Sequence, residues 1–119
     1  KSSAASDVYK RQSNDNPDYI IGTISLSHIN RGSSPSANMG YKIDRLNRGK
    51  GLASLMIAHM LDVVIPDLGI HRTECYIHPD NKISLHLMDK MSFIDEGIAH
   101  SYVKLNGKWQ DHRRFVYIS

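Results

Sequence analysis

Residues 38–65 constrain the fold most, because they combine an alternating segment, a glycine turn and a helical pattern. The run NMGYKID (38–44) alternates well enough for a strand. After RLNRGKG, the apolar positions that recur at helical spacing are Leu52, Leu55, Met56, Met60, Leu61 and Val64. We therefore expect a helix from about Gly51 to Ile65, ended by Pro66 and Gly69.

Two glycines and two basic residues directly precede this helix. The N–H groups of a first helical turn have no partner inside the helix, and the aligned peptide dipoles make that end partly positive. Glycine lets a backbone approach a ligand closely, and Arg48 and Lys50 carry charge of the right sign for phosphate. The turn therefore predicts a site for a phosphate-bearing ligand.

Two familiar phosphate-binding patterns fit this turn poorly. A P-loop, G-x-x-x-x-G-K-[ST], would need glycine at Asp44 and Ser or Thr at Gly51. The dinucleotide pattern G-x-G-x-x-G is met by Gly49 and Gly51 but has Ser54 in its third place. The preceding segment is also too polar for a parallel strand buried on both faces.

The other elements are expected from their own periodicities. We predict strands at Asp18–Ile29 and Ile70–His78, a short helix at Lys82–Met91, and two C-terminal strands joined by the hairpin turn at Asn106-Gly107. The order β-β-α-β-α-β-β predicts one α/β domain with a mixed sheet.

The N-terminal segment has a different composition. Residues 1–12 are rich in Ser and Ala without an apolar period, and the turn-forming run SNDNPD follows. We expect residues 1–17 to be a disordered or foreign leader, similar to a translated cloning adaptor, ahead of a domain spanning 18–119. Three of the 15 basic residues but one of the 12 acidic residues lie in 1–12, so the domain is nearly neutral. That balance argues against nucleic-acid binding.

Composition also limits the location of the protein and its metal chemistry. No window approaches the roughly 18 apolar residues of a membrane span, and no signal peptide is visible, so we expect a cytoplasmic protein without a membrane partner. The single cysteine, Cys75, excludes an internal disulfide framework. The seven histidines lack ligand spacings such as H-E-x-x-H, so we expect no metal.

Four motifs together resemble one known family. The glycine turn fits R/Q-x-x-G-x-G/A at Arg48, Gly49, Lys50, Gly51, Leu52 and Ala53. GIHRTECYIHPDNKIS resembles a strand followed by an Asn-led helix start, and KMSFIDEG resembles K-x-G-F-x-x-E-G. YVKLNGKWQDHRRFVYI resembles a C-terminal hairpin. This set is similar to the Gcn5-related (GNAT) acetyltransferases, in particular to the ribosomal-protein N-terminal alanine acetyltransferases.

The resemblance implies a GNAT-like mixed, mostly antiparallel sheet flanked by helices, without the family's N-terminal strand and first two helices. It implies acetyl-CoA as co-substrate. Residues 48–53 would hold the pyrophosphate, the main chain of Ile43 and Asp44 would pair with the pantetheine arm, and Asn81 would hydrogen-bond the cofactor. The expected acceptor is an amine, preferably a ribosomal-protein N-terminus. The alternatives are a polyamine or other small-amine acetyltransferase, or a truncated CoA-binding module without activity.

The resemblance also assigns an acid, while the base stays open. Ser84, three residues after Asn81, would protonate the leaving thiolate directly or through water, although a Ser at a helix start could instead merely cap the helix or be solvated. The oxyanion donor would be a backbone N–H near Ile43. By chemistry alone the candidate bases are Glu74, Glu96, His100 and Tyr102. A water chain could replace a base, since a free α-amino group has a pKa near 8.

One departure from the family concerns the end of the second helix. Ser92 stands where the family prefers glycine. We expect a left-handed backbone there, at a cost of roughly 1 kcal/mol.

Overall fold

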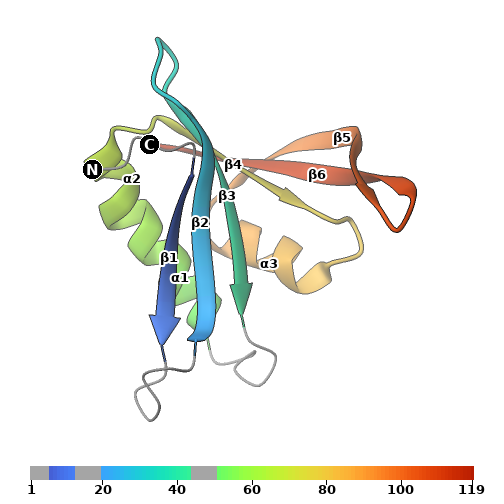
Figure 1. Cartoon of the computed structure of the whole chain (residues 1–119), viewed down its shortest axis with the longest axis horizontal. Coiled ribbons are helices and arrows are strands. Elements are labelled where there is room, and N and C mark those ends of the chain that lie inside the picture. Colours follow the sequence, from blue (N-terminus) through green and yellow to red (C-terminus); the bar gives the residue numbers. More distant parts are fainter. Residues whose placement is uncertain (1–5, 13–19, 44–50) are drawn as a thin grey trace.

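The structure is a computed structural model that describes residues 6–12, 20–43 and 51–119 (Figure 1). The strands are β1 (Ser6–Gln12), β2 (Ile20–Asn30), β3 (Ser36–Ile43), β4 (Arg72–Ile77), β5 (Ile94–Leu105) and β6 (Lys108–Ile118). The helical segments are α1 (Leu52–His59), η2 (Met60–Val64), α2 (Ile65–Leu68) and α3 (Lys82–Lys90). The predicted α/β class is confirmed.

The described strands form one sheet in the order β1-β2-β3-β4-β6-β5. The neighbouring pairs are antiparallel except β3 and β4, which run parallel. The predicted mixed, mostly antiparallel sheet is therefore confirmed.

The parallel pair is short, and the sheet opens beside it. The ladder between β3 and β4 covers three positions, from Ser36 opposite Arg72 to Asn38 opposite Glu74. Beyond it, the end of β3 pairs with β2 while the end of β4 pairs with β6. Figure 1 shows the two strands diverging from this point. The sheet thus divides into two arms that splay apart.

The hydrophobic core lies between the helices and one face of the sheet. The strands contribute buried alternating residues, among them Ile24, Leu26, Ala37, Met39, Cys75 and Ile77. The helices contribute Met56, Ile57, Met60, Leu61, Val64, Ile65, Leu87 and Met88. Burying each large apolar side chain stabilises the fold by about 1.5–3 kcal/mol, so this layer fixes α1 and α3 against the sheet.

The helix after the glycine turn continues through Pro66, so the prediction that Pro66 ends it is wrong. In the π-helical turn η2, the N–H of Ile65 bonds the carbonyl of Met60, five residues back. This wider turn comes directly before a proline at the start of α2, where a missing N–H is tolerated. Gly69, with φ 70°, ends the helix as predicted.

Residues 6–12 form β1, so the prediction that they are disordered is wrong. Ser6 lies opposite Ser27 and Arg11 opposite Gly22, in an antiparallel ladder with β2. The segment forms a strand without an apolar period because its main chain is hydrogen-bonded to the edge of β2. β1 also adds an edge strand that the sequence pattern did not predict.

Two backbone predictions made from single residues are confirmed. Asn106 and Gly107 have φ of 52° and 77°, the left-handed pair that a tight hairpin between β5 and β6 requires. Ser92 has φ 66° directly after α3. In the described ranges, no helix is long and apolar enough to cross a membrane.

Candidate functional site

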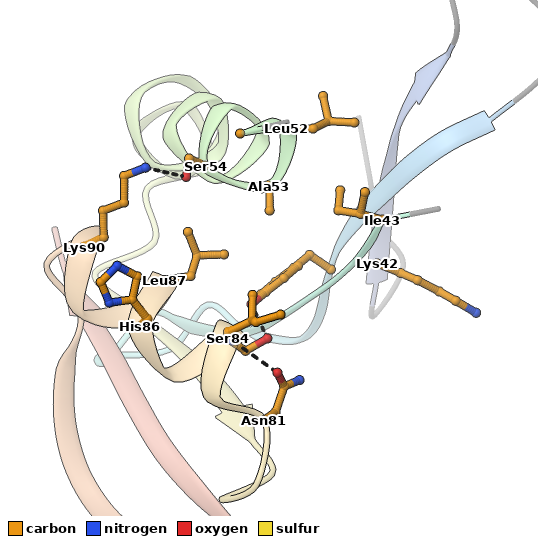
Figure 2. A pocket seen from close by; sticks show the side chains of 13 residues that line it. Lys42, Ile43, Leu52, Ala53, Ser54, Asn81, Ser84, His86, Leu87 and Lys90 are labelled. Atoms are coloured by element: carbon orange, nitrogen blue, oxygen red, sulfur yellow. Dashed lines mark hydrogen bonds between the residues drawn. The ribbon is translucent and has the colours of Figure 1, made fainter. Parts of the chain in front are cut away.

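A groove of about 480 Å³ lies between β3, α1 and α3, beside the point where the sheet opens (Figure 2). Six of the residues predicted to form the site line it: Ile43, Gly51, Leu52, Ala53, Asn81 and Ser84. The other four, Asp44, Arg48, Gly49 and Lys50, lie outside the described residues. The fold thus brings together side chains and main chain from three elements that are distant in the sequence.

The N-terminus of α1 contributes main-chain donors to this groove. Gly51 is the N-cap residue, with φ 71° and no side chain to cap the helix. The first bond of the helix runs from Leu55 N–H to the Gly51 carbonyl, so earlier N–H groups have no acceptor within α1. A Cβ on Gly51 would meet none of the described atoms within 4 Å. This end of the helix therefore has both the room and the partial positive charge to hold an anion.

The start of α3 is capped by Asn81. Its side-chain oxygen accepts a hydrogen bond from the main-chain N–H of Ser84 at 3.2 Å (Figure 2). The cap uses the amide oxygen of Asn81, so the Nδ2 group is the part that could donate to a ligand. Because Asn81 is the cap, the alternative that the hydroxyl of Ser84 caps the helix is wrong.

Ser84 instead places its hydroxyl against β3. The residue is 9% exposed, and its Oγ accepts a hydrogen bond from the hydroxyl of Tyr41 at 2.8 Å. Burial raises the pKa of Tyr41 above its usual range and outweighs the opposing effect of the bond to Ser84. Tyr41 therefore stays protonated at neutral pH. No sequence motif marks Tyr41, although alternation along β3 puts it on the same face as Met39 and Ile43.

Polar side chains border the groove near α1. Figure 2 shows Lys90 reaching from α3 toward Ser54, and its Nζ donates to the Ser54 hydroxyl at 3.2 Å. His86 also lines this part of the groove. Neither Lys90 nor His86 belonged to the predicted site, since no motif marks them. A cation beside an uncapped helix start favours an anionic ligand.

Comparison with known proteins decides the family. Residues 4–94 match the family model described as "Acetyltransferase (GNAT) domain". The chain belongs to the GNAT acetyltransferase family. The resemblance inferred from the motifs is therefore confirmed, and a match that begins at residue 4 includes β1 in the GNAT domain.

Two curated relatives show how much of the family this GNAT chain covers. The probable N-acetyltransferase YjcK of Bacillus subtilis is 38% identical over 96 residues, which are 81% of this chain and 53% of that protein. The [ribosomal protein uS5]-alanine N-acetyltransferase of Escherichia coli is 33% identical over 93 residues, 78% of this chain and 48% of that protein. The chain spans about half the length of these relatives.

Solved structures share the GNAT fold closely. The ribosomal-protein-S5-alanine acetyltransferase from Vibrio fischeri has a TM-score of 0.90 at 27% identity and is matched over 96% of this chain and 62% of that one. A spermidine N-acetyltransferase from Vibrio cholerae has a TM-score of 0.85 at 25% identity, and the match covers 98% of this chain and 67% of that one. Mycobacterium smegmatis RimJ in complex with CoA-disulfide has a TM-score of 0.80 at 26% identity, and the match covers 87% of this chain and 50% of that one.

The two candidate glutamate bases of this GNAT domain are engaged elsewhere. Neither Glu74 nor Glu96 is among the residues lining the groove. Glu74 accepts from Arg72 at 2.9 Å and from the Tyr76 hydroxyl at 2.7 Å. Burial acts to raise the pKa of Glu74, but these hydrogen bonds outweigh it and the pKa is lowered. The Arg72 hydrogen bond is the largest effect that lowers the pKa of Glu96, and Arg114 adds to it. A lowered pKa makes a carboxylate a weaker base.

His100 and Tyr102, the other two candidates, also lie outside the groove lining. The side chain of His100 is 82% exposed, and its Nδ1 lies 3.4 Å from the Asp111 carboxylate. Tyr102 stacks on Tyr76 with ring centroids 4.1 Å apart. In the described part of this GNAT chain, no candidate base reaches the groove.

Cys75 lies outside the groove lining, and the described residues hold no group of metal ligands. Burial raises the pKa of the Cys75 thiol to about 12, which keeps it protonated and unreactive. Among the described residues, no three His, Cys, Asp or Glu side chains are grouped as metal ligands would be.

Proposed function

We propose that this chain binds acetyl-CoA in the groove and transfers its acetyl group to an amine, preferably the N-terminal α-amino group of a ribosomal protein. One observation carries the proposal: an uncapped helix start opens onto the groove where β3 leaves β4. Such a site suits a ligand with an anionic head and a long neutral arm, and RimJ, a relative in fold, has been solved in complex with CoA-disulfide. A ribosomal acceptor would place the protein in the cytoplasm.

The binding roles follow from the groove. The N–H groups of Leu52, Ala53 and Ser54 would donate to the pyrophosphate, and Gly51 would let it approach the backbone. The turn at Arg48, Gly49 and Lys50 would add charge and further main-chain donors. The main chain of Ile43 and Asp44 would pair with the pantetheine arm, and Asn81 would donate from its Nδ2 group.

The transfer chemistry needs few side chains. A main-chain N–H near Ile43 would donate to the carbonyl oxygen of the acetyl group as that oxygen gains negative charge. One such donor typically raises kcat by about 10²–10³-fold. Ser84 would give a proton to the leaving sulfur, because its hydroxyl lies in the groove lining and serves no cap. Water would take the proton of the amine, since none of the candidate bases lines the groove.

The acceptor is inferred from relatives and from charge. The sequence relatives include the uS5-alanine acetyltransferase, and the structural relatives include spermidine acetyltransferases. A polyamine is a polycation and needs carboxylates that are not already neutralised. On strands β4, β5 and β6, three of the four described carboxylates pair with arginines: Glu74 with Arg72, Asp95 with Arg113, and Glu96 with Arg72 and Arg114. The fourth, Asp111, lies 3.4 Å from the ring of His100. This pairing favours the protein N-terminus over the polyamine.

Release of free CoA thiol from acetyl-CoA tests this proposal. The purified chain is incubated with a peptide that begins with alanine, with spermidine, or with no acceptor. A peptide of the same sequence with an acetylated N-terminus is the matched control. We expect release with the free peptide alone. Release only with spermidine would contradict the acceptor, and CoA binding without release in any arm would identify an inactive CoA-binding module.

A further inference from the structure

Tyr41 and Ser84 form a pair of hydroxyl groups in the wall of the groove. Tyr41 lies on β3 beyond Asn38, the last residue paired with β4, and Ser84 lies in the first turn of α3. Their hydroxyl oxygens are 2.8 Å apart, and both residues line the groove. The two are 43 positions apart in the chain, so the fold alone brings them together.

We propose that Tyr41 is a positioning residue that acts through Ser84, orienting its hydroxyl toward the leaving CoA sulfur and replacing the proton that Ser84 gives up. This inference rests on the proposed function. It adds to that function a second proton donor, which no sequence motif marks.

The direction of the hydrogen bond supports this role. A serine hydroxyl has one proton to donate and two lone pairs to accept with. When Tyr41 donates to Ser84, the proton of Ser84 is directed elsewhere, and the main-chain N–H of Ser84, not its hydroxyl, makes the cap to Asn81. The hydroxyl proton of Ser84 is therefore available on the groove side.

The acidity of the two groups supports it as well. A thiol ionises with a pKa near 8.5 and a tyrosine near 10, whereas a serine hydroxyl is a far weaker acid. Ser84 alone would lose its proton only at high cost, but a simultaneous transfer from Tyr41 leaves Ser84 neutral. Burial raises the pKa of Tyr41, so the tyrosine holds this proton throughout the neutral range and takes it back readily after the transfer.

The step balances as follows. The amine nitrogen forms a bond to the acyl carbon, the carbon–sulfur bond breaks, and its electron pair stays on sulfur. The Ser84 proton moves to that sulfur, and the Tyr41 proton moves to Ser84. The amine loses one proton to water, and the tyrosinate takes one proton back from water. The products are the amide and the free thiol, and both side chains are restored.

The pKa of the CoA thiol in the bound state tests this pair without any acetyl transfer. Free CoA is bound to the full chain, and the thiolate is followed by its ultraviolet absorbance during a pH titration. The variants are Tyr41→Phe, Ser84→Ala and their combination, with Tyr117→Phe, outside the groove lining, as matched control. Melting curves establish that each variant is folded.

We expect the bound thiol to have a pKa below that of free CoA, because a donated hydrogen bond stabilises the thiolate. Ser84→Ala should raise it by about one unit and Tyr41→Phe by about half a unit, the range of a hydrogen bond to a charged group. The combined variant should match Ser84→Ala, since Tyr41 acts through Ser84, and Tyr117→Phe should match the wild type.

Two results would overturn this inference and leave the proposed function standing. One is CoA binding with the same thiol pKa in the wild type and Tyr41→Phe, and the other is a further rise when Tyr41→Phe is added to Ser84→Ala. If the folded wild type does not bind CoA, the proposed function fails and the inference fails with it. With an amine that the chain acetylates, Tyr41→Phe should lower kcat about tenfold at unchanged KM. Added to the Ser84→Ala variant, Tyr41→Phe should not lower kcat any further.

Discussion

The ammonium group of Lys90 donates a hydrogen bond to the hydroxyl of Ser54 at 3.2 Å, which joins the last turn of α3 to the first turn of α1. Both residues line the groove. The bond keeps a positive charge beside the uncapped N–H groups of α1. A phosphate bound there would meet the helix end and the ammonium together.

Replacing Lys90 should therefore weaken CoA binding. We expect Lys90→Met to reduce the affinity up to about fivefold at low salt, the usual range for one partly exposed charge, and to make binding less dependent on salt. Calorimetry at two ionic strengths measures both effects. Lys108→Met, at the start of β6, is the matched control and should bind like the wild type. Equal affinity of Lys90→Met and the wild type at low salt would exclude Lys90 from the site.

Removing residues 1–12 should destabilise the domain, because β1 pairs with β2 along its whole length. Each main-chain hydrogen bond contributes about 0.5–1.5 kcal/mol, so we expect the free energy of unfolding to fall by about 2 kcal/mol or more. Urea denaturation followed by circular dichroism measures this loss. A change within about 0.5 kcal/mol, typical of a neutral surface change, would show that β1 adds nothing to stability.

The sequence was informative where local chemistry decides the structure. The turn at Asn106-Gly107 and the left-handed Ser92 depend on single backbone positions, and the apolar period marked the helix from Leu52. β1 was missed because its main chain pairs with β2, and residues 1–12 have no apolar period that would mark a strand. Tyr41 was missed because its hydrogen bond to Ser84 is a long-range contact that no local pattern encodes. The same holds for Lys90.

The hydroxyl of Thr73 gives a prediction about stability. The residue is fully buried where β4 pairs with β3, and its Oγ1 has no hydrogen-bond partner among the residues that the structure describes. A buried polar group without a partner costs about 1–3 kcal/mol. Thr73→Val keeps the shape and removes the hydroxyl, so the free energy of unfolding should rise by about 1 kcal/mol. A loss of stability on denaturation would mean that the hydroxyl has a partner.

The ion pairs on strands β4, β5 and β6 should make the stability of the fold depend on pH in the acidic range. The pKa of Glu96 is lowered by Arg72 in the folded state, so its contribution is present above the ordinary carboxyl pKa of about 4.3 and is lost as pH falls through the lowered value. Glu96→Gln removes this titration. Between about pH 6 and pH 3 the melting temperature of the wild type should therefore fall more than that of Glu96→Gln. Parallel curves would show that the pair does not contribute.

The most direct test of the central claim is calorimetric titration of CoA into Gly51→Glu and Gly69→Glu. Both glycines have φ near 70° (71° and 70°) with no described atom within 4 Å of an added Cβ. The two variants therefore carry the same charge and a similar backbone strain of about 1 kcal/mol. Only Gly51 lies at the start of α1 in the groove. We predict that Gly51→Glu is folded but does not bind CoA, while Gly69→Glu binds like the wild type. Unchanged affinity in Gly51→Glu would contradict the phosphate site at α1.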